Sequence, residues 1–265
     1  MFVLGGSIFM KEYYIEKAQS FIRYHDFPGN DIPIMFIHGL GCAGSFDYPE
    51  VATQEALKNH RCILVDLLGA GYSDKPNDFT CTVDSHAEYL AEFVSSIGLE
   101  SFILFGHSLG GAVAISLATK CRDRIDRIIL SEANLDKSSE GSTSKYIAEY
   151  DMQNFLENGF KQLMHDSRQS GNEMWASALS TWSPKAAYLI SKSAAKGEEP
   201  SWRENLYALD CPKTFIFGEN SLPDPDLKVL SNHKINIELV KNAGHSMAWE
   251  NPQELALAIK KGINL

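Results

Sequence analysis

The sequence of 265 residues predicts an α/β fold, in which one mostly parallel central sheet is flanked by helices. Three observations predict it. Short runs rich in branched and aromatic residues alternate with longer segments of helical periodicity. These runs are apolar at nearly every position, as strands buried on both faces of a parallel sheet must be. With 44% hydrophobic and 22% charged residues, the composition is that of an ordinary globular protein.

The elements can be assigned in chain order. A hairpin that is more exposed than the later strands is predicted at residues 12–27, because charged and aromatic residues are mixed there. Buried strands are expected at residues 32–37, 62–67, 101–105, 127–130, 213–217 and 235–240, and helices at residues 47–58, 83–97, 109–121 and 252–261. The final helix has strong start signals: Asn251 can cap it, Pro252 lies in its first turn, and Glu254 follows three residues after the cap.

The alternation stops after residue 130, and residues 135–205 contain no convincing strand. Helical spacing dominates there, with a helix expected over residues 146–164 and helix starts at Ser183-Pro184 and Ser201-x-x-Glu204. Such a segment is too large for a loop. The sequence therefore predicts an α/β core from residues 1–134 and 206–265, covered by a helical cap from residues 135–205.

A serine flanked by glycines follows the strand expected at residues 101–105. Gly106-His107-Ser108-Leu109-Gly110 has the G-x-S-x-G pattern of a nucleophile elbow, a sharp turn from a strand into a helix. The serine of such a turn holds a strained backbone, and Gly106 and Gly110 leave room around it. The following helix directs its N-terminal N–H groups at the reaction centre. Ser108 is therefore the candidate nucleophile.

A serine hydroxyl needs a base to take its proton, and histidine is the usual one. His245 lies between the last expected strand and the capped final helix. Because loops at the carboxyl ends of parallel strands converge on one site, His245 is the predicted base. Structural or solvent-exposed roles are predicted for the other seven histidines: His25, His38, His60, His86, His107, His165 and His233.

Four motifs in this order resemble the α/β-hydrolase family over nearly the whole chain. They are His38-Gly39-Leu40-Gly41, similar to its oxyanion motif; residues 66–74, similar to its signature loop; residues 106–111, the elbow; and residues 243–246 with 250–252, similar to its histidine segment. The resemblance implies that the N–H groups of Leu40 and Leu109 form an oxyanion hole, often worth about 3–4 kcal/mol of barrier. It also implies that Asp66 organises its loop rather than acting as the catalytic acid.

The acid of the expected catalytic triad departs from the family pattern. The usual Gly-x-x-Asp after the strand at residues 213–217 is replaced by Gly218-Glu219-Asn220-Ser221. Some haloalkane dehalogenases, which this chain resembles here, place the acid after the strand that follows the elbow helix, where this chain has Glu132. Glu132 is therefore the predicted acid that orients His245. Asp224, which would need a shifted loop, is the alternative, and a merely structural role for Glu132 stays open.

Serine at the elbow, where dehalogenases and epoxide hydrolases of this family carry aspartate, favours acyl transfer through an acyl-enzyme. The preferred hypothesis is a hydrolase of carboxylic esters with small to medium, apolar acyl chains, and Trp175 and Trp182 of the cap are candidates to line its pocket. One alternative is a C–C or amide-bond hydrolase, or an acyltransferase, on the same residues. Another is a small-ligand-binding protein without turnover, which the missing aspartate at Ser221 keeps open.

Charge and composition restrict the partners. With 34 acidic and 24 basic residues, the formal charge of −10 argues against nucleic acid and against anionic membrane surfaces. Residues 1–10 are uncharged but too few to cross a bilayer, and no basic residue precedes them, so a cytoplasmic protein is expected. The cysteines (Cys42, Cys62, Cys81, Cys121 and Cys211) are scattered and are predicted to be reduced and mostly buried. No metal or organic cofactor is expected.

Overall fold

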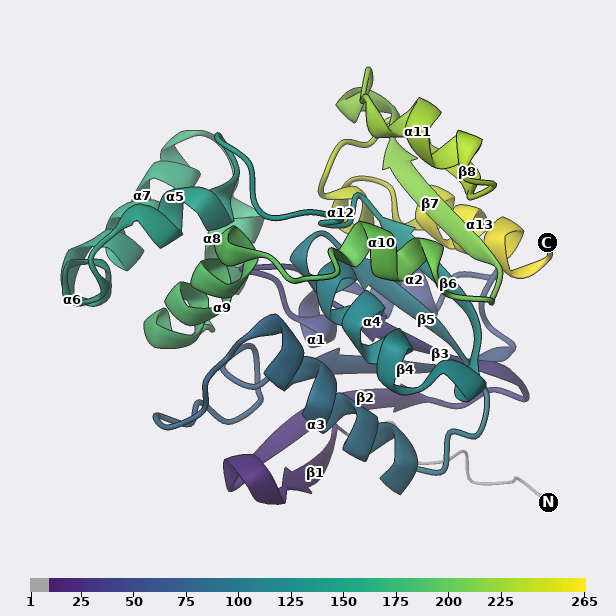
Figure 1. Ribbon diagram of the computed structural model, residues 1–265, viewed down its shortest axis with the longest axis horizontal. Coiled ribbons are helices and arrows are strands. Elements are labelled where there is room, and N and C mark those ends of the chain that lie inside the picture. Colours follow the sequence, from purple (N-terminus) through teal and green to yellow (C-terminus); the bar gives the residue numbers. More distant parts are fainter. Residues whose placement is uncertain (1–9) are drawn as a thin grey trace.

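The computed structural model describes residues 10–265, so residues 1–9 of the predicted core and of its uncharged first stretch lie outside the described part. An eight-stranded sheet in the order β1-β2-β4-β3-β5-β6-β7-β8 runs through the molecule (Figure 1). β1 pairs antiparallel with β2, and β2 with β4, whereas all the other pairs are parallel. The predicted fold class is confirmed.

The strands form within a residue or two of the predicted positions. They are β1 (Lys11–Ile15), β2 (Ser20–Phe27), β3 (Asp31–Ile37), β4 (His60–Asp66), β5 (Phe102–His107), β6 (Ile125–Ser131), β7 (Lys213–Gly218) and β8 (Asn236–Val240). Every residue of β5 is buried, because the strand lies inside the sheet and helices cover both of its faces. β5 therefore provides a rigid base for the turn that follows it.

Helices cover both faces of the sheet. On one face lie α3 (Val83–Ser96), α4 (Leu109–Lys120) and α10 (Trp202–Tyr207); on the other lie α2 (Pro49–Ala52), α12 (Met247–Glu250) and α13 (Pro252–Ile263) (Figure 1). As predicted, Asn251 caps α13 by accepting a hydrogen bond from the N–H of Glu254. No helix among residues 10–265 is both long and apolar enough to cross a membrane.

The helix predicted over residues 47–58 is wrong. The chain instead forms α1 (Gly44–Asp47) and then α2, followed by hydrogen-bonded turns as far as β4. Pro49 has no N–H and restricts the residue before it, so the first helix ends and a second one begins there. After Ala52, turn bonds such as that from Leu57 N–H to Gln54 C=O replace the helical ones.

The described segment between β6 and β7 is helical, without a strand. It contains α5 (Thr143–Glu149), α6 (Met152–Asn154), a π-helical turn (Phe155–Gly159), α7 (Phe160–Gln169), α8 (Glu173–Leu179), α9 (Pro184–Lys196) and α10. In Figure 1, α5 to α9 form a lobe beside the sheet, whereas α10 packs against α4. We call residues 135–205 the insertion.

Both helix starts predicted in the insertion are confirmed. Ser183 caps α9 by accepting from Ala186 N–H, and Ser201 forms a reciprocal capping box with Glu204. The single helix predicted over residues 146–164 is wrong. Tyr150 has an extended backbone and ends α5, and Asp151 then caps α6 with its side chain, so the chain changes direction there.

Candidate active site

Ser108 occupies the sharp turn between β5 and α4. Its φ of +51° lies in the left-handed region, which a serine rarely adopts. Three hydrogen bonds hold this backbone: its N–H donates to Ser131 C=O at 3.0 Å, and its C=O accepts from the N–H groups of Gly111 and Asn134 at 2.9 Å each. The turn is therefore fixed by β6 and by the first turn of α4, as expected of a strained functional position.

The two glycines flanking the serine are required by close packing. A Cβ on Gly106 would lie 2.7 Å from Ala114 Cβ, and one on Gly110 would lie 2.2 Å from His38 C=O. The predicted need for glycine at both positions is thus confirmed. The tight contact at Gly110 also brings the loop that follows β3 against the start of α4.

A continuous chain of hydrogen bonds joins three of the predicted residues. His245 Nε2 lies 3.0 Å from Ser108 Oγ, and His245 Nδ1 lies 2.6 Å from Glu132 Oε2. The three side chains come from the ends of β5 and β6 and from the loop after β8, which meet at the carboxyl edge of the parallel strands. A hydroxyl, an imidazole and a carboxylate in this order can transfer a proton from the hydroxyl.

Glu132 is held in place from the neighbouring strand. Its N–H donates to Ile216 C=O at 3.0 Å, and its Oε1 accepts from Gly218 N–H at 2.9 Å. Burial by itself raises the pKa of the carboxyl, but hydrogen bonds from His245, Ser221 and Gly218 and the charge of His245 outweigh it, so the pKa lies below its usual value. Ser221, which stands where the family pattern has aspartate, thus stabilises the carboxylate of Glu132.

The other two candidate acids lie elsewhere. Asp224 Oδ1 accepts from Asp226 N–H at 2.7 Å, at the start of α11 (Asp226–Asn232), and no hydrogen bond joins it to His245 in the part of the chain described. Asp66 is fully buried and accepts hydrogen bonds from Ser45 N–H, Ser45 Oγ and Tyr72 N–H. These contacts tie the loop after β4 to α1, which is the structural role expected for Asp66.

The N–H groups of Leu40 and Leu109 donate to no acceptor within residues 10–265. Leu109 is the first residue of α4, and Leu40 lies on the loop packed against it. A Cβ on Gly39, the residue before Leu40, would lie 3.0 Å from Ser108 Cβ, so this loop passes directly beside the serine. Two N–H groups without an acceptor in the described chain therefore lie on the two segments that adjoin Ser108.

Two buried histidines, His38 and His107, lie close to the residues of the site. His38 Nε2 accepts from Leu67 N–H at 3.0 Å, and the ring of His107 lies 4.7 Å from that of His245. Burial, with a smaller contribution from the charge of His245, lowers the pKa of His107 to about 3. His107 is thus neutral at neutral pH, and it does not oppose a positive charge on His245.

A cavity of about 490 Å³ opens above these groups, between the sheet edge and the insertion. It is lined by Leu40, Ser108, Leu109, Glu132, Asn134, Gly141, Ser142, Thr143, Ser144, Leu163, Ser167, Asn172, Trp175, His245 and Ser246. Trp175 lines it as expected, and its Nε1 donates to Leu40 C=O at 2.9 Å. The polar residues of the insertion were not predicted, because its path over the sheet leaves no local signal.

Trp182 does not line this cavity, so that expectation is wrong. Its side chain is buried, its Nε1 donates to Cys42 C=O at 2.7 Å, and its ring packs edge-on against His38. The ring therefore anchors the insertion to the loop after β3. Trp182 serves packing rather than contact with a ligand.

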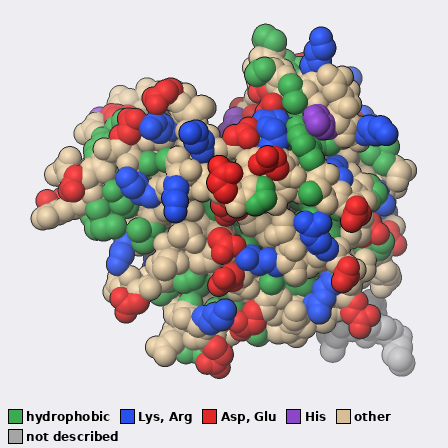
Figure 2. Space-filling view, viewed as in Figure 1, with side chains coloured by type: hydrophobic (Ala, Val, Ile, Leu, Met, Phe, Trp, Pro, Cys, Tyr) green, Lys and Arg blue, Asp and Glu red, His purple; other side chains and the backbone are tan. Residues whose placement is uncertain are grey.

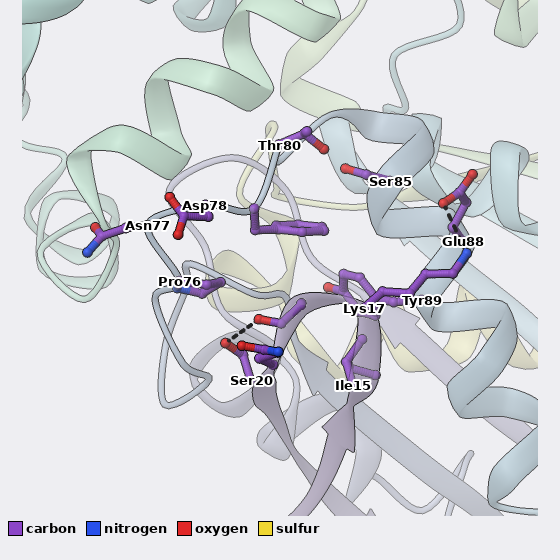
Figure 3. Close-up of a pocket in the computed structure, with 13 residues that line it drawn as sticks. Ile15, Lys17, Ser20, Pro76, Asn77, Asp78, Thr80, Ser85, Glu88 and Tyr89 are labelled. Atoms are coloured by element: carbon purple, nitrogen blue, oxygen red, sulfur yellow. Dashed lines mark hydrogen bonds and ion pairs between the residues drawn. The ribbon is translucent and has the colours of Figure 1, made fainter.

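A second hollow, of about 540 Å³, lies between the turn joining β1 to β2, the loop before α3, and α3 itself (Figure 3). Lys17 and Glu88 border it, with 3.8 Å between their charged atoms, and Tyr89 forms part of its wall. It has no histidine or cysteine in its lining. Of these two hollows, only the first brings a nucleophile, a base and free N–H donors together.

Neither a cluster of metal-ligating residues nor a disulfide occurs in the described chain. No group of three or more His, Cys, Asp or Glu within residues 10–265 could hold a metal ion. The five cysteines are free; Cys42, Cys62 and Cys81 are buried, and Cys121 and Cys211 are half-buried. Burial raises the pKa of Cys62 and of Cys81 to about 12, which keeps these thiols protonated.

The buried carboxyl of Asp47, in α1 just beyond the loop that carries Leu40, is expected to make the stability of the protein depend on pH. Burial raises the pKa of its carboxyl to about 8, and Oδ1 has no hydrogen-bond partner in the described chain that would oppose this rise. The unfolded chain loses this proton near pH 4, so the free energy of unfolding falls as the pH rises from about 4 to about 8. The free energy of unfolding of Asp47→Asn, minus that of the wild type, should therefore rise by about 1 kcal/mol or more from pH 5.5 to pH 8. Urea unfolding at both pH values measures this, and a constant difference would contradict it.

Comparison with known proteins gives concordant matches. The family model described as alpha/beta hydrolase fold matches residues 32–252. The esterase YbfF of Escherichia coli K12 is 24% identical over 271 residues, covering 94% of this chain and 98% of that protein. Haloalkane dehalogenase 2 of Mycobacterium tuberculosis is 31% identical over 118 residues, which are 44% of this chain and only 40% of that protein.

A solved structure extends the likeness to the whole fold. The thermophilic esterase from Thermogutta terrifontis, in its malate-bound form, superposes with a TM-score of 0.77 at 20% identity, covering 97% of this chain and 98% of that one. At this identity the likeness concerns the fold alone.

Proposed function

Because the chain belongs to the α/β-hydrolase family, we propose that it is a serine hydrolase that cleaves carboxylic esters of small to medium acyl chain through an acyl-enzyme on Ser108. The observation that carries the proposal is the hydrogen-bonded chain from Glu132 through His245 to Ser108 Oγ. It lies at the base of a cavity large enough for a small molecule.

The first step is proton removal from Ser108. Glu132 is a carboxylate and can only accept, so His245 carries its proton on Nδ1 and leaves Nε2 free as the acceptor. When Ser108 Oγ attacks the ester carbonyl, Nε2 takes the hydroxyl proton. The resulting imidazolium is stabilised by the carboxylate 2.6 Å away.

The negative charge that develops on the carbonyl oxygen needs donors beside Ser108. The free N–H groups of Leu40 and Leu109 supply them in this proposal, and α4 adds the favourable end of its dipole. Collapse of the tetrahedral intermediate then expels the alcohol, which receives its proton from His245 Nε2. An ester of Ser108 remains.

Hydrolysis of that ester repeats the steps with water as the nucleophile. His245 Nε2 takes a proton from the water, which attacks the acyl carbon, and returns it to Ser108 Oγ as the acid departs. The side chain of His245 is 55% exposed, so water can approach the imidazole. A dehalogenase-type reaction fits less well, because the nucleophile position holds serine rather than the aspartate carried by the family members with that activity.

Hydrolysis of p-nitrophenyl esters of increasing acyl length by the purified protein tests the proposal. Ser108→Ala is the blank, and Ser177→Ala, an exposed serine on α8, is the matched control. We expect release that depends on Ser108, with the highest kcat/KM at a short or medium acyl length. Release no greater than that of the blank at every length would reject an ester hydrolase and favour another bond type or a ligand-binding role.

A further inference from the structure

The cavity above Ser108 carries little charge. Of its lining residues only Glu132 and His245 have ionisable side chains, and both belong to the proposed catalytic chain. No lysine or arginine lines it, so a carboxylate or phosphate on the substrate would be buried without a cation and close to Glu132. The lining therefore disfavours anionic substrates.

The surroundings of the cavity also disfavour anionic substrates. A neighbouring hollow of about 430 Å³ shares Gly141, Thr143 and Leu163 with it. Three acids border this hollow: Glu140, Glu149 and Asp166. Its one cation, Lys145, lies 3.7 Å from Glu140 and 3.5 Å from Glu149, so it is already paired. Acidic and basic side chains are also mixed over the face shown in Figure 2, without a continuous basic surface.

The walls of the cavity are nevertheless polar. Asn134, Thr143, Asn172 and Ser246 line it, and the side chains of Asn172 and Ser246 make no capping bond to α8 or α12 (Met247–Glu250), the helices they precede. Water can satisfy these groups while the site is empty. An alkyl chain that displaced this water would leave them unpaired, whereas a substrate with its own donors and acceptors would replace the lost bonds.

Apolar contacts are confined to a few residues. Leu40 and Leu109 lie beside the nucleophile, Trp175 is fixed to Leu40 through its indole N–H, and Leu163 lies on α7. Ser167 is one helical turn from Leu163, and its hydroxyl donates to Leu163 C=O, which leaves its oxygen able to accept. The site thus offers a short apolar contact near Ser108 and hydrogen-bonding groups around it.

We propose that the natural substrate of this site is a small uncharged ester that carries hydroxyl or amide groups, and that Asn134 and Asn172 select for those groups. This inference rests on the proposed ester hydrolysis and replaces the apolar acyl chain expected from the sequence. Asn134 follows Glu132 at the end of β6, and Asn172 precedes α8, so the two amides come from the sheet and from the insertion.

Four ethyl esters of similar size test the proposal: ethyl butanoate, ethyl 3-hydroxybutanoate, the ethyl ester of N-acetylglycine, and monoethyl succinate. Their kcat/KM values are measured by pH-stat titration. We expect the hydroxyl and amide esters to exceed the butanoate by about tenfold, the value of one well-made hydrogen bond. The anionic succinate should be the poorest substrate.

Variants test whether Asn134 and Asn172 select for the polar groups of the substrate. Asn172→Leu and Asn134→Leu should each bring the ratio of hydroxyl or amide ester to butanoate toward one. Asn158→Leu, an exposed asparagine of the insertion outside this cavity, should keep the wild-type ratio. Because Asn172 is exposed, its variant tests the inference even if Asn134→Leu does not fold.

The outcomes separate the two proposals. If p-nitrophenyl acetate is cleaved in a Ser108-dependent reaction but the polar esters have no advantage over butanoate, the substrate inference is overturned and ester hydrolysis stands. An unchanged ratio in Asn172→Leu would overturn the role of that residue. If no ester is cleaved, including p-nitrophenyl acetate, both proposals are rejected together.

Discussion

Replacement of His245 by glutamine is expected to lower kcat for ester hydrolysis by about a million-fold, the loss typical of removing the base of a serine hydrolase. Glutamine can still donate to Glu132, but its amide cannot take the proton of Ser108 Oγ, which lies 3.0 Å from Nε2 in the wild type. Steady-state hydrolysis of the best p-nitrophenyl ester measures the loss.

His165→Gln is the matched control, because His165 is exposed on α7 and does not line the cavity above Ser108. It should retain the wild-type rate, and circular dichroism should show that both variants are folded. A His245→Gln protein within tenfold of the wild type would mean that another group removes the serine proton.

Glu132→Gln is expected to lower kcat by about ten-thousand-fold while the protein stays folded. The glutamine oxygen can still accept from Gly218 N–H, so the local structure is kept. Its NH₂ group, however, would donate to His245 Nδ1 and force the ring proton onto Nε2. That nitrogen could then no longer accept the proton of Ser108.

Asp224→Asn is the paired variant, since Asp224 was the alternative acid. Its carboxylate accepts from Asp226 N–H and makes no hydrogen bond to His245 among the described residues, so we expect near wild-type turnover. The reverse result, in which Asp224→Asn is inactive and Glu132→Gln is active, would require a different loop arrangement after β7 in the working enzyme.

Much of the fold could be predicted because its signals are local. The apolar runs predicted the strands, and Asn251, Ser183 and Ser201 predicted helix starts that the structure confirms. Ser108 was identifiable because its turn imposes glycine at nearby positions. Helices 47–58 and 146–164 were mispredicted where periodicity continued but Pro49 and Asp151 interrupted the backbone.

The family could be predicted from four short motifs in a fixed order along the chain, and the elbow at Ser108 and the loop position of His245 from the local sequence around each residue. Which carboxylate reaches His245 depended on the tertiary structure, because β6 lies beside β7 and Gly218 N–H of β7 donates to Glu132. The tertiary structure also decided that Trp182 packs against the core while Asn134 and Asn172 line the cavity. The packing of the insertion on the sheet sums many weak contacts between residues distant in the chain, and no short sequence pattern records them.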